Sequence, residues 1–303
     1  MSFYRSFNIR GWLTLCLAAA VSLSVSAADD GKPVPSWPGP ADGPLPFESH
    51  EQVLNYLKNS KVVSSESIGS GTNDTRRLTL SGAAGREKKV PGAAGSKNRL
   101  EVYAVFRNVD IEFNRPTQVS GRFVPDFRDS YIFEVAAYRL SRLLQIDQVP
   151  PAVLRRYRSQ AGSVQLWIYG AISETKRRQQ GQQAPDDQRW TRQVQTKLLF
   201  DRLINNLDRN LGNQLIDRNW KLWLIDHTRS FGASDELRSP QAVYWCSERV
   251  YQALKTLDRE KVRHELRGLL RSNELKALFN RWDKLTAHLD SLIQERGREA
   301  VLF

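Results

Sequence analysis

The sequence predicts an α+β fold in which strands and one helix come first and helices make up the C-terminal third. Apolar and polar residues alternate between 62 and 107, as is typical of strands. A helical apolar stripe follows at 129–144, and Leu-rich amphipathic segments occupy 250–258, 260–270 and 273–296. The chain has 303 residues, 40% hydrophobic and 26% charged, which is enough for one or two globular domains with a core.

The first 28 residues have the features of a secretory signal peptide. Arg5 and Arg10 precede an apolar run at 12–25, and the small residues at 25–28 suit signal peptidase. The run is short for a membrane span, and an uncleaved N-terminal anchor is the alternative. We therefore expect an exported protein, periplasmic or extracellular, with no transmembrane span after cleavage.

The charge balance points to anionic partners. The formal net charge is +12, and it is +10 without the first 28 residues, which carry two arginines and no acids. A basic surface attracts anions of many kinds. No nucleic-acid-binding motif is present, so no nucleic-acid partner is expected. Phosphorylated substrates or an anionic envelope surface suit an exported protein, and added solubility is the alternative.

Cysteine and histidine usage argues against two kinds of site. Cys16 lies in the expected signal, so Cys246 is left without a partner for an intrachain disulfide. The four histidines lack the spacing of a zinc site. We therefore expect the core itself to stabilise the fold.

Two segments of unusual composition flank the first strands. Residues 29–46 are rich in Pro, Gly and Asp and are predicted to be an extended linker. A short amphipathic helix is predicted after it, at 50–58. Residues 82–98 combine Gly-Ala repeats with basic residues and are predicted to be a mobile loop.

A glycine-bearing turn separates the first two predicted strands. Val62–Val63 and 77–80 have strand patterning, and Gly69 and Gly71 lie between them. Glycines in such a turn let backbone N–H groups approach a phosphate. An ordinary turn is the alternative, and the position of this one ahead of the residues described below favours the phosphate-binding interpretation.

The next strand and helix each carry a charged residue at a notable place. The predicted strand 100–107 ends in Arg107, and the predicted helix 129–144 carries Glu134 near its start. Asp129 or Ser130 can cap this helix. A Glu in the first turn of a helix is also favoured by the helix dipole, which is the alternative to a functional role.

The middle of the chain predicts two strands, a loop and a helix. Strands are expected at 152–154 and 163–168. The polar, Gln-rich residues 173–189 are predicted to be an exposed loop. Helical periodicity returns at 190–207 and leads directly to Asp208.

Asp208, Asn213 and Asp226 have the chemistry of a phosphoryl-transfer centre. Such a centre needs a carboxylate for the attacking hydroxyl, and oxygen ligands for Mg²⁺ or Mn²⁺. Asp208 suits the first role, and Asn213 and Asp226 suit the second. Predicted strands at 214–216 and 222–225 form a hairpin that would return Asp226 beside Asp208, although any hairpin can carry an Asp at each end.

The run from Asn206 to Asn213, followed by Leu224-Ile225-Asp226, resembles the atypical kinases that use Asp-Arg-x-x-x-Asn in place of His-Arg-Asp. These include the phosphatidylinositol 3/4-kinases, the bacterial persistence-toxin serine kinases and the Golgi secretory casein kinase/four-jointed group. The resemblance is clearest over residues 195–232. It implies a two-lobed protein-kinase-like fold with an N-lobe at 47–172 and a C-lobe at 173–303, ATP as cofactor, and Mg or Mn.

The resemblance also implies a transfer of the ATP γ-phosphoryl group to a protein Ser or Thr, or to a lipid or sugar hydroxyl. An exported protein fits the secretory group best. The implied roles are Asp208 as catalytic base, Asn213 and Asp226 as metal ligands, Arg107 as phosphate contact, Glu134 as its partner, Gly69 and Gly71 over the phosphates, and Trp167 and Tyr169 at the adenine-binding hinge.

Two residues depart from the kinase pattern. Arg107 stands where kinases normally have Lys, and a guanidinium does not replace an ammonium freely. His227 follows Asp226 where many kinases have Phe or Asn-Gly. The first departure leaves two alternatives: a nucleotide-binding pseudokinase, and a non-catalytic exported protein that binds an anionic partner.

Overall fold

The computed structural model describes residues 36–40, 43–69, 75–83, 99–113, 115–119, 121–124 and 127–303. These residues all belong to one unit, Val34–Phe303. The signal peptide expected at 1–28, the turn residue Gly71 and most of the loop expected at 82–98 lie outside the described residues.

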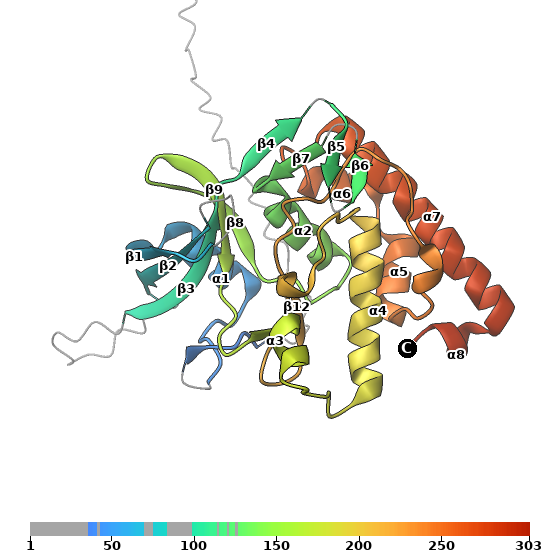
Figure 1. Cartoon of the computed structure of the whole chain (residues 1–303), viewed down its shortest axis with the longest axis horizontal. Coiled ribbons are helices and arrows are strands. Elements are labelled where there is room, and N and C mark those ends of the chain that lie inside the picture. The colour runs from blue at the N-terminus through green and yellow to red at the C-terminus, as the bar shows by residue number, and fades with distance from the viewer. Residues whose placement is uncertain are drawn as a thin grey trace, which may run out of the picture. The chain divides into compact units, whose positions relative to one another are not determined.

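A five-stranded antiparallel sheet forms the N-terminal part, in the order β1-β2-β3-β9-β8. The helices α1 and α2 both pack against β8 and β9 (Figure 1). The predicted strand at 100–107 is confirmed with the same bounds. The elements are α1 (His50–Asn59), β1 (Lys61–Ser67), β2 (Arg76–Gly82), β3 (Leu100–Arg107), α2 (Ile132–Leu143), β8 (Ala152–Tyr157) and β9 (Gln160–Leu166).

The described residues of the expected linker pack against this sheet. Trp37 and Leu45 are buried, and they join Val53 of α1 and Leu80 of β2 in one hydrophobic cluster. Pro38 and Pro44 form an isolated antiparallel bridge. Residues 36–40 and 43–46 therefore do not form the extended linker that the sequence predicts. Burial of large apolar side chains stabilises their packed arrangement.

Two small hairpins separate β3 from α2. In the first, β4 (Asp110–Phe113) pairs with β7 (Phe127–Ser130); in the second, β5 (Thr117–Val119) pairs with β6 (Arg122–Val124). Arg128 of β7 donates to Glu274 at 3.0 Å, so the first hairpin is joined to the longest helix of the C-terminal part. The sequence patterning did not indicate these short strands.

The C-terminal part is mainly helical, with a small sheet in the order β10-β11-β12. Helices α4, α5, α6 and α7 begin near the segments that the sequence predicts, whereas α3 and α8 were not predicted. The elements are β10 (Ile172–Ser173), α3 (Glu174–Gln179), α4 (Asp187–Leu203), η2 (Leu211–Asn213), β11 (Gln214–Ile216), β12 (Leu222–Leu224), η3 (Pro240–Ala242), α5 (Glu248–Thr256), α6 (Arg259–Glu265), α7 (Ser272–Arg296) and α8 (Arg298–Val301).

The exposed loop predicted at 173–189 is wrong in part. Ser173 caps the short helix α3 by accepting a hydrogen bond from the Lys176 N–H, and Glu174 pairs with Arg177 and Arg178 one turn later. Capping and pairs at i,i+3 and i,i+4 stabilise a helix. The Gln-rich composition of the segment hid these local signals.

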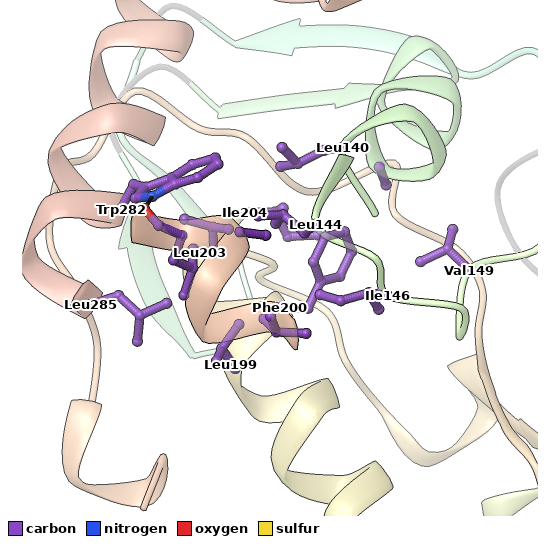
Figure 2. Packing of buried hydrophobic residues seen from close by; sticks show 14 of the residues in the cluster. Leu140, Leu144, Ile146, Val149, Leu199, Phe200, Leu203, Ile204, Trp282 and Leu285 are labelled. Carbon is purple, nitrogen blue, oxygen red and sulfur yellow. Dashed lines mark hydrogen bonds between the residues drawn. The ribbon is translucent and has the colours of Figure 1, made fainter. Parts of the chain in front are cut away.

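Helix α2 is fixed by its apolar stripe. Phe133, Ala137, Leu140 and Leu144 are all fully buried. Figure 2 shows Leu140 and Leu144 in the same cluster as residues of α4 and α7, including Leu203 and Trp282. The helix therefore belongs to the helical core while it also packs against the sheet.

Neither Asp129 nor Ser130 caps α2, although the sequence suggests that they can. The helix begins at Ile132, and the N-cap residue Tyr131 makes no side-chain capping bond. Asp129 and Ser130 instead end β7. Their side chains are therefore free for tertiary contacts.

The buried Arg281 of α7 is hydrogen-bonded to the segment that follows β12. It donates to the carbonyl oxygens of Leu203, Gly232 and Ser234. Burial lowers the pKa of Arg281 to about 10, so the side chain stays charged at neutral pH.

None of the described helices is both long and apolar enough to cross a membrane.

Replacing Arg281 by Met would leave these carbonyl groups without their donor. Each buried acceptor that loses its partner costs about 1–3 kcal/mol, so we expect Arg281→Met to lower the free energy of unfolding by roughly 2–5 kcal/mol. The exposed Arg263 forms an ion pair with Glu260 on the same helix and lies over the Phe279 ring, so Arg263→Met should change the value by less than about 1 kcal/mol. Urea titration measures both, and equal losses would contradict a fixing role for Arg281.

Candidate active site

The loop between α4 and β11 carries Asp208 and Asn213 and is folded on itself by hydrogen bonds. The Asp208 N–H donates to Asn206 Oδ1 at 2.9 Å, and Asn213 Nδ2 donates to the Asp208 carbonyl oxygen at 2.9 Å. Asn210 Oδ1 accepts from the N–H groups of Gly212 and Asn213 and so caps the short helix η2. These bonds bring the two predicted site residues side by side.

Arg209 holds this loop against α4 and the end of the β11–β12 hairpin. Its Nε donates to both carboxylate oxygens of Asp201 at 3.1 Å. Its Nη1 donates to the carbonyl oxygens of Asn213 at 2.8 Å and Ile225 at 2.6 Å. Arg209 is not among the site residues predicted from the sequence, although its place directly after Asp208 in the Asp-Arg-x-x-x-Asn motif was a signal.

Asp226 follows β12 and lies beside the same loop. The Ile225 N–H donates to the Asn213 carbonyl oxygen at 3.2 Å, which joins the residue before Asp226 to the predicted metal ligand. Asp226 has a φ of 58°, in the left-handed region that Asp tolerates better than most residues. Thr228 Oγ1 donates to Asp226 Oδ1 at 3.1 Å, and the Asp226 side chain is 37% exposed.

Arg107 reaches this site from the end of β3. Its Nη1 lies 3.6 Å from Glu134 Oε1, and its Nε lies 3.9 Å from Asp226 Oδ1. Gln165 of β9 accepts from Arg107 Nη1 at 3.5 Å and donates to Glu134 Oε2 at 3.2 Å. The strand and helix predicted to carry Arg107 and Glu134 therefore bring the two side chains together.

Glu134 is completely buried, with 0% of its side chain exposed. Burial alone would raise its pKa, but the Arg107 charge and hydrogen bonds from His227 outweigh burial and lower the pKa to about 2. The His227 N–H donates to Glu134 Oε1 at 3.0 Å, and His227 Nδ1 lies 3.2 Å from Glu134 Oε2. The residue that departs from the kinase pattern after Asp226 thus contacts the same carboxylate as Arg107.

Arg229 contacts two acidic residues from different elements. Its Nε donates to Asp129 Oδ2 at 2.7 Å, and its Nη1 donates to Asp208 Oδ2 at 3.1 Å. Burial lowers the pKa of Arg229, but its hydrogen bond to Asp129 and the charges of Asp129, Asp208 and Asp226 reverse this effect and raise the pKa overall. Arg229 is not among the site residues predicted from the sequence, because its partner Asp129 lies 100 positions away.

The other predicted nucleotide-binding residues are two glycines of the first turn and two aromatic residues after β9. Gly69 is exposed just beyond β1, and Gly71 is outside the described residues. The Tyr169 ring stacks on Tyr103 at 5.4 Å, and its hydroxyl accepts the Tyr103 N–H at 2.6 Å. Arg77 lies over the Trp167 ring at 5.4 Å. These two aromatic side chains pack on the sheet.

The oxygen atoms near Asp208 fit a hard divalent cation in chemical type. Asn213 uses Nδ2 for its bond to the Asp208 carbonyl oxygen, which leaves Oδ1 as the side-chain atom that could bind a metal ion, and Asp226 could add a carboxylate. Mg²⁺ commonly takes one or two protein oxygens and completes its shell with phosphate and water. In the described ranges, no group of three or more His, Cys, Asp or Glu could hold a metal ion. A bound ion would complete its shell with phosphate oxygens or water.

No protein-family model matches the sequence, and no curated protein matches it significantly. Solved structures do match. A hydra Fam20 solved with sugar has a TM-score of 0.58 and 16% identity, over 83% of this chain and 91% of that one. A Golgi casein kinase has a TM-score of 0.57 and 16% identity, over 84% and 79% of the two chains. Its structure with Mn and ADP bound has a TM-score of 0.55.

This chain has an atypical protein-kinase fold. The α+β class and the likeness to this kinase group that the sequence predicts are therefore confirmed. The sheet with α1 and α2 is the N-lobe of the kinase fold, and the mainly helical part is its C-lobe. At 16% identity the likeness concerns the fold, and the roles of individual residues stay predictions.

The low pKa of Glu134 predicts how stability depends on pH. Because the folded-state pKa of about 2 lies below the usual 4.5, ionised Glu134 stabilises the fold above about pH 4.5, and this contribution is lost as the pH falls toward 2. We expect Glu134→Gln to lower the free energy of unfolding by roughly 3 kcal/mol at neutral pH. The difference from wild type should shrink between about pH 4.5 and 3.

Urea titrations of both proteins at neutral pH and at several acidic pH values measure this difference. Glu66 forms an ion pair with Arg77 on the exposed strand β1, so Glu66→Gln is a suitable control and should have little effect. If the difference in free energy of unfolding between wild type and Glu134→Gln stayed constant down to pH 3, the low folded-state pKa of Glu134 would be contradicted.

Proposed function

We propose that this protein is an exported atypical kinase that transfers the γ-phosphoryl group of ATP to a hydroxyl group of a protein Ser or Thr, a lipid or a sugar. One observation carries the proposal. Asp208, Asn213 and Asp226 lie in one hydrogen-bonded unit, and Arg107 is ion-paired with both Glu134 and Asp226. This arrangement, on a kinase fold, supplies a base, oxygen ligands and a phosphate-binding cation.

In the proposed reaction, Asp208 orients the acceptor hydroxyl and takes its proton. A bond forms between the acceptor oxygen and the γ-phosphorus, and the bond from the γ-phosphorus to the β,γ-bridging oxygen breaks. The electron pair of that bond leaves with ADP, and the proton passes from Asp208 to solvent. Because the transition state of such transfers is loose, positioning and charge stabilisation are the main contributions of the protein.

Arg107 is proposed to bind the phosphates. The buried carboxylate of Glu134 and the amide of Gln165 hold its guanidinium at the end of β3, close to Asp226. A preorganised cation stabilises developing negative charge without a cost of reorganisation during the reaction. Asn213 and Asp226 would hold Mg²⁺ or Mn²⁺, and a bound ion would supply further positive charge against the phosphate oxygens.

Export and the acceptor class rest on other features of the chain. The charge and apolar pattern of residues 1–28 favour a signal peptide, and the net charge of +12 favours an anionic substrate or envelope surface. The names of the similar structures refer to a casein kinase and to a sugar-bound protein. Protein and sugar hydroxyls are therefore the first acceptors to test, and phosphoinositides are the next.

Substitution of the two proposed acidic site residues tests the function directly. We expect Asp208→Asn to lower transfer from radiolabelled ATP by about 10²–10⁴-fold, because general-base catalysis contributes that much. The variant should still gain thermal stability with ATP and Mn²⁺. Asp226→Asn should lose this ATP- and Mn²⁺-dependent thermal shift, because it removes a metal ligand.

The control is Asp147→Asn, because Asp147 is exposed and pairs with Lys221 outside the site. Its transfer rate and thermal shift should equal those of the wild type. Casein, a simple sugar panel and phosphoinositides serve as acceptors in the same assay. Wild-type transfer that persists in both Asp208→Asn and Asp226→Asn would rule the proposal out.

A nucleotide-binding pseudokinase is the second candidate, and one contact favours it. Arg107 lies within 3.9 Å of Asp226, so its guanidinium already compensates part of the charge that a metal ion would compensate. A protein of this kind would bind ATP without transfer. Under this candidate, the wild type shows a thermal shift with ATP but no labelled product, and Arg107→Lys gains activity. Transfer by the wild type that falls in Arg107→Lys would exclude it.

A further inference from the structure

Arg229 links the two halves of the kinase fold next to the proposed base. Its guanidinium spans Asp129 at the end of β7 and Asp208 in the loop after α4, with contacts of 2.7 Å and 3.1 Å. Each partner uses its Oδ2 atom for this contact. A planar guanidinium can donate to two carboxylates at once in a fixed geometry, which an ammonium cannot do equally well.

The backbone around Arg229 makes the same connection as its side chain. The Ser130 N–H donates to the Thr228 carbonyl oxygen at 2.8 Å, and the Leu207 N–H donates to the Arg229 carbonyl oxygen at 3.0 Å. The segment 228–229 is therefore bonded on one side to the end of β7 and on the other to the residue before Asp208. The position of the Arg229 Cα atom is fixed relative to both partners of its side chain.

Asp129 is built to hold Arg229. It is only 3% exposed, and a buried carboxylate is costly unless a cation or hydrogen-bond donors compensate its charge. It does not cap α2, and its Oδ1 has no hydrogen-bond partner among the residues that the structure describes. The Arg229 Nε contact is thus its main compensation. Removal of Arg229 would leave a buried charge that repels Asp208.

Asp208 is held from two directions. Arg229 Nη1 donates to Oδ2, and Asn210 Nδ2 donates to Oδ1 at 3.1 Å. Asn210 is exposed and lies in the same loop, so it moves with Asp208. Arg229 is the partner that comes from outside the loop. The orientation of the Asp208 carboxylate relative to the rest of the site therefore depends on Arg229.

We propose that Arg229 is a positioning residue, which orients the Asp208 carboxylate toward the acceptor hydroxyl while Asp129 fixes the guanidinium. The inference rests on the proposed kinase function. Arg229 is hydrogen-bonded to the base and not to Arg107, Asn213 or Asp226, which are the proposed phosphate and metal contacts. Loss of Arg229 should therefore slow the transfer step and leave ATP binding intact.

The test measures initial rates of transfer from ATP, with Mn²⁺, for Arg229→Met and Arg229→Lys. The acceptor is the one that the wild type uses best, and slow ATP hydrolysis by water is a second readout. We expect Arg229→Met to lower kcat by about 10- to 100-fold with KM for ATP changed by less than about twofold, because a small misplacement of a reacting group costs about this much. Arg229→Lys should retain more activity than Arg229→Met.

Arg259→Met is the matched control. Arg259 is 31% exposed, against 34% for Arg229, and it pairs with Asp283 on α7 away from the site. This variant should keep the wild-type kcat and KM even if its melting temperature falls. If Arg229→Met does not fold, the test uses Arg229→Lys alone. A lower kcat than the wild type at unchanged KM for ATP then supports the proposal.

Two results would overturn the inference alone. One is wild-type kcat in the Arg229 variants while Asp208→Asn is inactive. The other is a rise in KM for ATP equal to the fall in kcat, accompanied by a lower melting temperature, which is the signature of a merely structural role. Transfer by Asp208→Asn at the wild-type rate would instead defeat the proposed function, and the inference with it.

Discussion

The buried ion pair between Arg107 and Glu134 is the interaction on which the arrangement of the site depends. Glu134 lies on α2, whose apolar stripe packs into the helical core (Figure 2), and Arg107 ends a central strand of the N-lobe sheet. A charge buried this deeply is tolerated only with a close partner, so the pair fixes the sheet relative to α2. His227 donates its backbone N–H to the same carboxylate, which extends the constraint to the residue after Asp226.

Several arginines of this basic chain donate hydrogen bonds to backbone groups of the protein itself. Arg209 donates to the carbonyl oxygens of Asn213 and Ile225, Arg281 donates to those of three separate residues, and Arg155 donates to those of Leu57 and Ser60 at the end of α1. A guanidinium has five N–H groups and can satisfy several acceptors at once. Part of the net charge of +12 therefore serves the fold, and only the remainder is available to attract an anionic substrate or surface.

Sequence patterns predicted the features that are local. The alternation at 100–107 and the stripe on α2 are properties of one element, and the Asp208–Asn213 interval with its following hairpin lies within one short stretch. The strands between β3 and α2 are too short to show a period. The burial of Glu134 and the bridge from Arg229 to Asp129 could not be predicted, because they depend on how distant elements pack. Helix α3 was missed because its signals are capping and ion pairs, with little apolar periodicity.

We propose that the buried pair organises a site for a metal-bound nucleotide at the junction of the two lobes. Isothermal titration of the wild type and Glu134→Gln with ADP and Mn²⁺ tests it most directly, since no acceptor is needed. We expect measurable binding by the wild type and an affinity at least about tenfold lower in the variant, equivalent to about 1.4 kcal/mol. Equal affinities in the two proteins, or no binding by a folded wild type, would contradict it.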